Sequence, residues 1–243
     1  MANNYFQFKQ FTVFQEGCAM KVTTDACLFG AWVAKIVADK SSLINESSIL
    51  DIGTGTGLLS LMVAQKSSCT IDAVEIDGEA FSEATNNFKN SSWRDRLTVF
   101  NDDVKKYQQE NSLPYNFILT NPPFFDNDLK SNSSKRNLAM HCEQLSLEEL
   151  LVAIKRLLHV DGYFAILLPH HRSIYFEELA AANGFHLAEK IVVKQTPSHS
   201  PFRTMLLFGN KKEEIVENEI IIKDGNIYTD NFSNLLKDYY LYL

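Results

Sequence analysis

The chain has 243 residues, of which 45% are hydrophobic and 22% charged, the balance of a folded protein with a sizeable core rather than of a disordered or fibrous chain. No stretch approaches about 18 uninterrupted apolar residues, and the N-terminus lacks the basic-then-apolar pattern of a signal peptide, so we expect neither a membrane span nor export. The formal net charge of −7 argues at first against a nucleic-acid partner.

The charge is distributed unevenly along the chain. Residues 129–212 hold 11 basic and 7 acidic side chains, whereas residues 1–128 hold 10 and 16, and residues 213–243 hold 2 and 7. A protein with a negative total charge can therefore still carry a local basic face. The four cysteines include no C-x-x-C pair, so we expect reduced thiols in a cytoplasm, with no disulfide framework and no metal site.

The predicted elements begin with a short pair of strands over residues 5–16, where aromatic and polar side chains alternate. Thr23, Thr24 and Asp25 are N-cap candidates for a helix over residues 25–38, whose apolar residues recur at helical spacing. From Ser48 onward, strand patterns alternate with helix patterns. The predicted strands span residues 48–52, 70–76, 97–100, 116–120, 163–168, 186–194 and 204–208, and the helices between them span residues 57–65, 78–90, 147–158 and 173–183.

Strands that alternate with helices form a mostly parallel sheet with right-handed crossovers. The last two strands, joined by residues 195–202, are candidates for the antiparallel edge that mixed sheets often carry. We therefore predict an α/β fold of the Rossmann-like type. Its sheet would have seven strands, mostly parallel with an antiparallel edge strand, and helices on both faces.

The C-terminal part of the chain has a different pattern. Residues 219–222 and 227–228 predict a hairpin around a turn at residues 224–226, and a helix follows from Asn231 to about Tyr239. We expect a single domain over residues 1–243, made of an N-terminal cap (1–46), a catalytic core (47–212) and a C-terminal hairpin and helix extension (213–243).

A glycine-rich motif, Asp51-Ile52-Gly53-Thr54-Gly55-Thr56-Gly57, ends the first strand of the alternating series and opens a helix. Glycines let the backbone turn tightly and approach a ligand with no Cβ in the way, at the carboxyl end of a strand, where open α/β sheets bind ligands. A phosphate loop would need G-x-x-x-x-G-K-[ST], and a dinucleotide fingerprint would need glycine at Leu58. The spacing D-x-G-x-G-x-G is that of S-adenosylmethionine-dependent methyltransferases, and a plain tight turn is the alternative.

Acidic residues follow the next two strands. Glu75 lies 22 residues after the first glycine of the motif, where a doubly wound fold places an acid that accepts hydrogen bonds from both ribose hydroxyls. We assign the adjacent Ile76 to the same cofactor site. After the third strand, Asp103 can accept a hydrogen bond from the adenine amino group, with Asp102 as a close competitor and Val104 next to it.

The most distinctive motif is Asn121-Pro122-Pro123-Phe124, at the end of the fourth strand. The prolines fix the backbone and lack N–H donors, so the Pro122 carbonyl and the Asn121 side-chain carbonyl are free to accept from one planar amino group. Phe124, with Phe125 beside it, can stack on the ring that carries this amine. Two acceptors on the amine protons draw electron density toward the nitrogen as it attacks a methyl group, and alignment adds a proximity contribution.

The two motifs together resemble those of N-methyltransferases that carry [N/D/S]-P-P-[Y/F/W]. The segment from Cys18 to Trp32, CAMKVTTDACLFGAW, is similar to the N-terminal signature of the bacterial enzymes that N6-methylate adenine-37, beside the anticodon, of a valine tRNA. The resemblance extends over essentially the whole chain and implies S-adenosylmethionine-dependent tRNA methylation. It also implies that Lys21, Thr23 and Asp25 lie near the methionine carboxylate and amine of the cofactor.

The implied acceptor is an adenine in the anticodon loop, which leaves its stack at a lower cost than a paired base. We expect Lys130, Lys135 and Arg136, in an Asn- and Ser-rich segment, to contact the RNA phosphates. One alternative is a glutamine N-methyltransferase that acts on a release factor, but such enzymes usually carry a helical N-terminal domain, and little sequence precedes Ser48. The other is a nucleoside-binding module without catalysis, which would not need the amine-holding motif.

Overall fold

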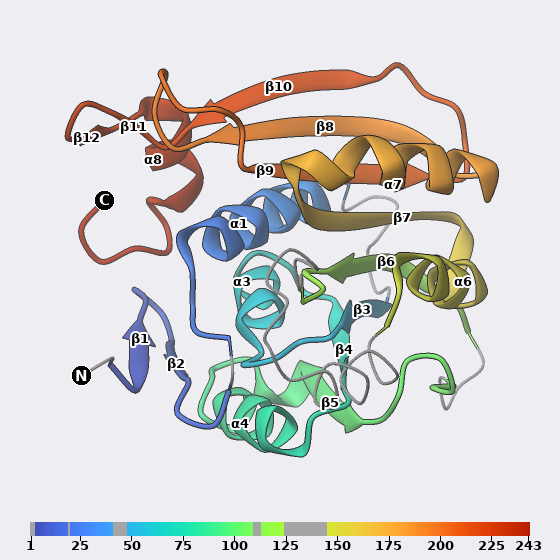
Figure 1. Cartoon of the computed structure of the whole chain (residues 1–243). Coiled ribbons are helices and arrows are strands. Elements are labelled where there is room, and N and C mark those ends of the chain that lie inside the picture. The colour runs from blue at the N-terminus through green and yellow to red at the C-terminus, as the bar shows by residue number, and fades with distance from the viewer. Residues whose placement is uncertain (1–2, 19, 41–47, 109–112, 124–144) are drawn as a thin grey trace, which may run out of the picture.

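The computed structural model describes residues 3–18, 20–40, 48–108, 113–123 and 145–243. Its main strands are β3 (Ser48–Ile52), β4 (Thr70–Glu75), β5 (Leu97–Asn101), β6 (Tyr115–Thr120), β7 (Leu158–Pro169), β8 (His186–Lys194), β9 (Arg203–Gly209) and β10 (Val216–Ile221). In this part of the chain they form one eight-stranded sheet in the order β10-β8-β9-β7-β6-β3-β4-β5, which runs through the molecule in Figure 1.

The sheet is mostly parallel. The pairs β3–β4, β3–β6, β4–β5, β6–β7 and β8–β10 are parallel, and β9 runs antiparallel to both of its neighbours, β7 and β8. The predicted fold class is thereby confirmed for the seven strands from β8 to β5. The structure adds two details. The antiparallel strand β9 lies between β8 and β7, and β10 extends the sheet beyond β8.

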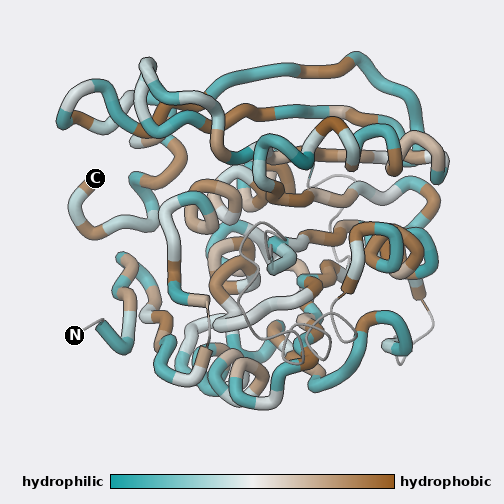
Figure 2. The backbone as a smooth tube through the Cα atoms, in the orientation of Figure 1, coloured by the Kyte–Doolittle hydropathy of each residue, from teal (hydrophilic) through white to brown (hydrophobic). Residues whose placement is uncertain are grey.

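Helices cover both faces of the sheet. They are α1 (Thr24–Asp39), α3 (Leu58–Lys66), α4 (Gly78–Lys89), α6 (Leu147–Leu157), α7 (His170–Ala182) and α8 (Asp230–Leu236), with a 3₁₀ turn η1 (Arg94–Arg96). One core contains Phe29 of α1, Leu61 of α3, Phe88 of α4 and Phe232 of α8. The other lies under α6 and α7 and includes Phe176. Figure 2 shows hydrophobic residues along the central strands, while β10 includes a hydrophilic stretch, in keeping with its mostly exposed residues.

Side-chain caps fix where four of these helices begin, including α8, which Thr229 caps. Thr23 is the N-cap of α1, and its hydroxyl accepts a hydrogen bond from the Ala26 N–H. The Asp77 carboxylate accepts from the first turn of α4, and Ser146 forms a capping box with Glu149 at the start of α6. Each cap accepts from N–H groups that have no partner inside the helix.

The predicted C-terminal hairpin is wrong in its first strand. Residues 219–221 belong to β10, which pairs in parallel with β8. The hairpin is formed instead by β11 (Lys223–Asp224) and β12 (Ile227–Tyr228). The physical reason is that β8 offers an open sheet edge, and pairing with it buries Ile220 in the core.

Segments from both ends of the chain pack on the α1 face. At the N-terminus, β1 (Tyr5–Gln7) and β2 (Thr12–Phe14) form the predicted antiparallel pair. At the C-terminus, the buried Tyr239 hydroxyl donates to the Met62 carbonyl of α3 at 3.0 Å. None of the helices in the described ranges is long and apolar enough to cross a membrane.

Candidate active site

Four neighbouring parallel strands end at one edge of the sheet, and the predicted site residues follow them. Ile52 of β3 is in register with Thr120 of β6 and with Val74 of β4. The next residues, Gly53, Asn121 and Glu75, therefore lie side by side across three strands. On the fourth strand, Asn101 is in register with Glu75. The sheet thus brings together the glycine motif, the predicted catalytic motif and the ribose-binding candidate, which are far apart in sequence.

The glycine motif forms the turn between β3 and α3. Gly53, Gly55 and Gly57 all have positive φ, at 68°, 56° and 80°, which residues with a Cβ rarely adopt. A Cβ at Gly57 would also lie 2.5 Å from Cε1 of Phe88 in α4, whereas one at Gly53 would meet no atom within 4 Å. Gly57 is therefore needed for packing, and Gly53 borders open space.

Asp51, the acid of the motif, is fully buried. Its Oδ2 accepts hydrogen bonds from the hydroxyls of Thr54 at 2.6 Å and Ser60 at 2.7 Å. Its Oδ1 has no hydrogen-bond partner in the part of the chain that the structure describes. Burial raises the pKa of this carboxyl from 3.8 to about 6, because the interior disfavours the charged form. The orphaned oxygen keeps the capacity to accept a hydrogen bond.

Glu75 connects two loops at the end of β4. Its Oε2 accepts a hydrogen bond of 2.8 Å from the Gly55 N–H, and its Oε1 accepts one of 2.9 Å from the Asp77 N–H. The Asn101 side-chain amide holds the same strand end by donating to the carbonyls of Glu75 and Ile76. The Ile76 side chain is 62% exposed, so an apolar surface adjoins the glycine turn.

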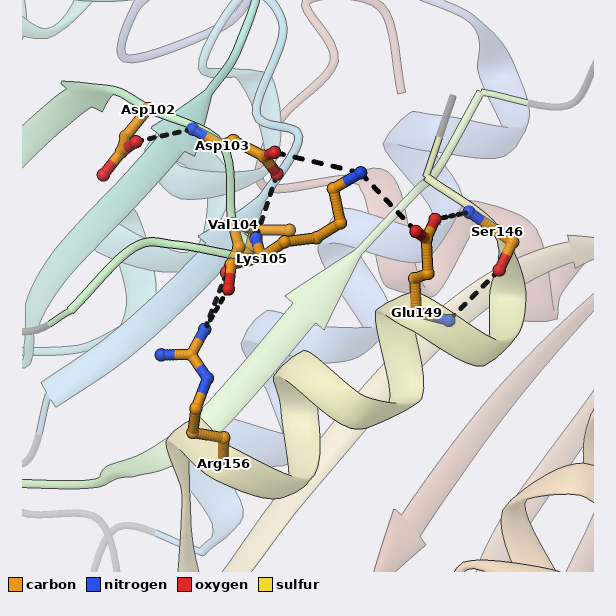
Figure 3. A network of polar contacts seen from close by, with 7 residues as sticks. All are labelled: Asp102, Asp103, Val104, Lys105, Ser146, Glu149 and Arg156. Carbon is orange, nitrogen blue, oxygen red and sulfur yellow. Dashed lines mark hydrogen bonds and ion pairs between the residues drawn. The ribbon is translucent and has the colours of Figure 1, made fainter. Parts of the chain in front are cut away.

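The turn after β5 is drawn in Figure 3. Asp102 is exposed, and its carboxylate accepts a hydrogen bond from the Asp103 N–H. The Asp103 side chain is 22% exposed and points toward Lys105, away from the Asp102 carboxylate. Val104 is buried. The two aspartates thus differ in environment, and their contact with adenine stays a prediction.

The predicted catalytic motif is described in its first three residues, 121–123. Thr120, at the end of β6, is buried, and its hydroxyl donates to the Ile52 carbonyl at 2.9 Å, which ties the motif to β3. Asn121 is half-buried, Pro122 is buried and Pro123 is exposed. The remaining predicted substrate contacts lie outside the described residues. They are Phe124, Phe125, Lys130, Lys135 and Arg136.

The three residues expected near the methionine end of the cofactor have partners within the protein. The Lys21 ammonium donates to the carbonyls of Gln15 and Glu16, and Thr23 caps α1. Asp25 forms an ion pair of 2.7 Å with Nε of Arg203 in β9. Lys21 is thus bound to the segment that follows β2, and Asp25 to the first residue of β9. Their contacts with the cofactor stay predictions.

Residues that the sequence did not single out support the site. Asn87 of α4 donates from one amide to the carbonyls of Thr56, in the glycine turn, and Phe14, in β2. Cys18 follows β2, and its sulfur would lie 3.6 Å from a Cβ at Gly55. The N-terminal segment is thereby held against the glycine turn. A buried asparagine on an otherwise amphipathic helix is a sequence signal for such a role, but nothing in the sequence indicates its partners.

The chemistry of the site fits a nucleoside that carries a cation. The Asp51 Oδ1 atom has no partner in the described residues, a Cβ at Gly53 would meet open space, and the Glu75 carboxylate lies against the glycine turn. Among the described residues, no group of three or more His, Cys, Asp or Glu side chains is placed to hold a metal ion.

Comparison with known proteins agrees with this architecture. Residues 34–168 match the family model of the methyltransferase small domain. A crystal structure of a predicted O-methyltransferase from Agrobacterium tumefaciens is 16% identical, with a TM-score of 0.66 over 88% of this chain and 96% of that one. TYW2 of P. horikoshii, solved in complex with MeSAdo, is 13% identical, with a TM-score of 0.60 over 85% and 71%.

Fold, site and family model together define the chain as a methyltransferase. Its sequence is 45% identical over 245 residues, 98% of each chain, to the tRNA1(Val) (adenine(37)-N6)-methyltransferase of Dyadobacter fermentans. The chain belongs to the family of tRNA1(Val) (adenine(37)-N6)-methyltransferases.

Proposed function

We propose that this chain transfers the methyl group of S-adenosylmethionine to N6 of an adenine in tRNA, and that the adenine is nucleotide 37 of a valine tRNA. The observation that carries the proposal is the row formed by Gly53, Glu75 and Asn121 at one sheet edge. It juxtaposes a nucleoside cradle with a motif suited to hold a planar amine. Family membership along nearly the full length of the chain supports the same acceptor.

The cofactor would be held by residues from three strand ends. The Asp51 Oδ1 accepts from its ammonium group, Glu75 accepts from its ribose hydroxyls, and Gly53 leaves room for its backbone. Ile76 packs on one side of the adenine, and Asp103 and Val104 bind its edge. When bound, this cofactor supplies a methyl group on a positively charged sulfur. Lys21, Thr23 and Asp25 stay predicted contacts for its methionine end.

The chain's own contribution to the reaction centres on Asn121. The Asn121 side-chain carbonyl and the Pro122 carbonyl accept from the two N6 protons, which orients the nitrogen lone pair toward the methyl group. As the N–C bond forms and the methyl–sulfur bond breaks, positive charge develops on N6, and both acceptors stabilise it. One N6 proton then leaves to solvent. Pro123 has no N–H that competes for these acceptors.

The acceptor base would leave its stack and enter the site. Phe124 and Phe125 stack on the base, and Lys130, Lys135 and Arg136 contact the phosphates around it. We propose that residues 1–243 form one methyltransferase domain. We also propose that the protein acts in the cytoplasm, where tRNA is found. Glutamine N-methylation of a release factor and nucleoside binding without catalysis are the outcomes against which it is tested.

The deciding experiment offers the protein two acceptors separately. Total tRNA from cells that lack the modification, and a release factor, are each incubated with S-adenosylmethionine labelled in its methyl group. We expect label in N6-methyladenosine after digestion of the tRNA to nucleosides, and none in the protein. Label in glutamine of the release factor would favour the protein acceptor, and cofactor binding without transfer to either would favour the binding module.

A further inference from the structure

The segment after β5 forms a single helical turn. The N–H groups of Lys106 and Tyr107 both donate to the Asp103 carbonyl, at 2.8 and 2.9 Å. The Lys105 N–H donates to Oδ1 of the Asp103 carboxylate at 3.0 Å. Of the N–H groups from 103 to 107, that of Val104 alone has no acceptor in the described residues. The turn therefore offers one unused donor.

The same turn offers an unused acceptor next to this donor. The Oδ2 atom of Asp103 lies 3.9 Å from the Lys105 Nζ, which is beyond hydrogen-bond distance. Lys105 also lies 3.5 Å from Oε1 of Glu149, at the start of α6. The Asp103 side chain is thus oriented by its neighbours while Oδ2 keeps the capacity to accept.

Arg156, in the last turn of α6, holds this turn from behind. Its Nη2 donates to the carbonyls of Val104 at 2.8 Å and Lys105 at 3.3 Å (Figure 3). Its Nη1 donates to the Tyr107 carbonyl at 2.6 Å. These carbonyls end a helical turn, where no intrahelical donor reaches them. The guanidinium is a rigid planar donor, so it fixes three peptide groups relative to one another.

The end of the turn has a second anchor. The buried Tyr107 hydroxyl is hydrogen-bonded to the Tyr115 hydroxyl at 2.8 Å, which in turn donates to Asp72 at 2.7 Å. Tyr115 and Asp72 belong to β6 and β4. Because this anchor acts through the side chain of Tyr107 alone, it leaves the peptide groups of Val104 and Lys105 to Arg156.

We infer that Arg156 is a positioning residue that sets the preference of the cofactor site for adenine, by fixing the donor of Val104 and the acceptor of Asp103 at the spacing of the adenine edge. The inference rests on the proposed use of S-adenosylmethionine and deepens it. Adenine presents a donor, its amino group, beside an acceptor, N1. Hypoxanthine presents a carbonyl and an N1–H in the same places, so both contacts would be reversed.

A fixed turn rejects the reversed pattern because both polar groups would be left facing like groups. A turn that can shift accepts either base weakly. Loss of Arg156 should therefore reduce the discrimination between the two bases, whereas a general loss of folding would weaken both ligands alike. The ratio of two affinities separates positioning from a merely structural role.

The test measures binding of S-adenosylhomocysteine and S-inosylhomocysteine by calorimetry to the full chain. In the wild type we expect clearly tighter binding of the adenine compound. In Arg156→Met its affinity should fall by about tenfold, the effect of roughly one hydrogen bond to a charged group, with a much smaller change for the inosine compound. Arg156→Lys, which keeps one donor in place, should give an intermediate ratio and covers the case that Arg156→Met does not fold.

Lys155→Met is the matched control. Lys155 precedes Arg156 on α6, and its ammonium also donates to a backbone carbonyl, that of Asn183 at 2.9 Å, which is the C-cap of α7. It should keep the wild-type ratio. An unchanged ratio in Arg156→Met, with the wild type binding the adenine compound, would overturn the inference alone. A wild type that binds neither nucleoside would overturn the proposed function and the inference with it.

Discussion

The Glu75 carboxylate, at the end of β4, accepts a hydrogen bond of 2.8 Å from the backbone N–H of Gly55 in the glycine turn. Its other oxygen accepts from the Asp77 N–H at the N-cap of α4. Glu75 therefore shapes the site before any ligand arrives. A carboxylate oxygen has two lone pairs, so each oxygen can still accept from a ribose hydroxyl.

This double role determines how Glu75 should be tested. Glu75→Ala would remove the ligand contact and the loop contact together, whereas Glu75→Gln keeps one acceptor oxygen. We expect Glu75→Gln to weaken S-adenosylmethionine binding by about 1.5–3 kcal/mol, the value of a hydrogen bond to a charged group, as measured by calorimetric titration. Unchanged affinity in a folded Glu75→Gln protein would reject the ribose assignment.

The glycine turn provides a matched pair of substitutions. Gly53→Ala and Gly57→Ala both place a Cβ on a residue with positive φ, at a cost of about 1–2 kcal/mol each. At Gly57 the new atom also meets the Phe88 ring at 2.5 Å, and overpacking adds about 1–3 kcal/mol. Gly57→Ala should therefore be the less stable protein in urea unfolding.

We expect Gly53→Ala to bind S-adenosylmethionine more weakly than the wild type, by more than its loss of stability explains. Its Cβ enters open space, which the proposal assigns to the cofactor. A Gly53→Ala protein that is folded and binds S-adenosylmethionine as tightly as the wild type would show that the ligand lies elsewhere.

Asp51 gives the protein a specific pH dependence. Its pKa is about 6 in the folded state against 3.8, so between these values the folded protein binds more protons than the unfolded chain, and stability falls as pH rises. Above about pH 6 the loss is complete and amounts to at most about 3 kcal/mol. Asp51→Asn removes the charge. As the pH rises from 4 to 7, its free energy of unfolding, measured in urea, should therefore increase relative to that of the wild type.

Cofactor binding should respond to the same proton in the opposite direction. If the Asp51 Oδ1 accepts from the cofactor's ammonium, binding favours the ionised carboxylate and releases a proton below about pH 6. Affinity then falls with decreasing pH by at most about tenfold per unit, and this change should be absent in Asp51→Asn. Calorimetry at pH 5 in buffers of different ionisation enthalpy measures the released proton, and a result of no release would contradict the assignment.

The tRNA contacts predicted for Lys130, Lys135 and Arg136 are accessible to a salt series. Replacing all three by alanine should weaken tRNA binding and flatten its salt dependence, by roughly 0.7–0.9 in slope per lost phosphate contact, without affecting S-adenosylmethionine binding. The control variant replaces Lys211 and Lys212 by alanine. These two residues follow β9, at the sheet edge opposite to the one that carries Gly53 and Asn121. Parallel lines for the triple variant and the wild type would exclude this segment from phosphate contact.

The positions of Gly53, Glu75 and Asn121 after strands were predictable, because strand patterns and the motifs that follow them are local signals. Gly53, Glu75 and Asn121 each follow a recognisable strand, and parallel strands end at the same sheet edge. The hairpin was misplaced because the pairing of β10 with β8 depends on an open edge formed by residues 186–194, far away in sequence.

Long-range partners account for the rest of the difference. Arg203 and Asp25 are 178 positions apart, and no pattern in the sequence pairs them. Arg156 lies in the last turn of an amphipathic helix, where a basic residue is ordinary, so its contacts with the turn after β5 were not predictable. The Gly55–Glu75 hydrogen bond also depends on backbone positions that only the folded loop defines.

The proposed mechanism depends most directly on Asn121, which would hold the amine that receives the methyl group. The measurement is single-turnover methylation of unmodified valine tRNA, at saturating S-adenosylmethionine, by the wild type and by Asn121→Ala. We predict a rate constant lower by on the order of 10²–10³ in the variant, as for the loss of one transition-state contact, with unchanged cofactor affinity. A rate constant within about threefold of the wild type, less than about 1 kcal/mol of barrier, would contradict the claim.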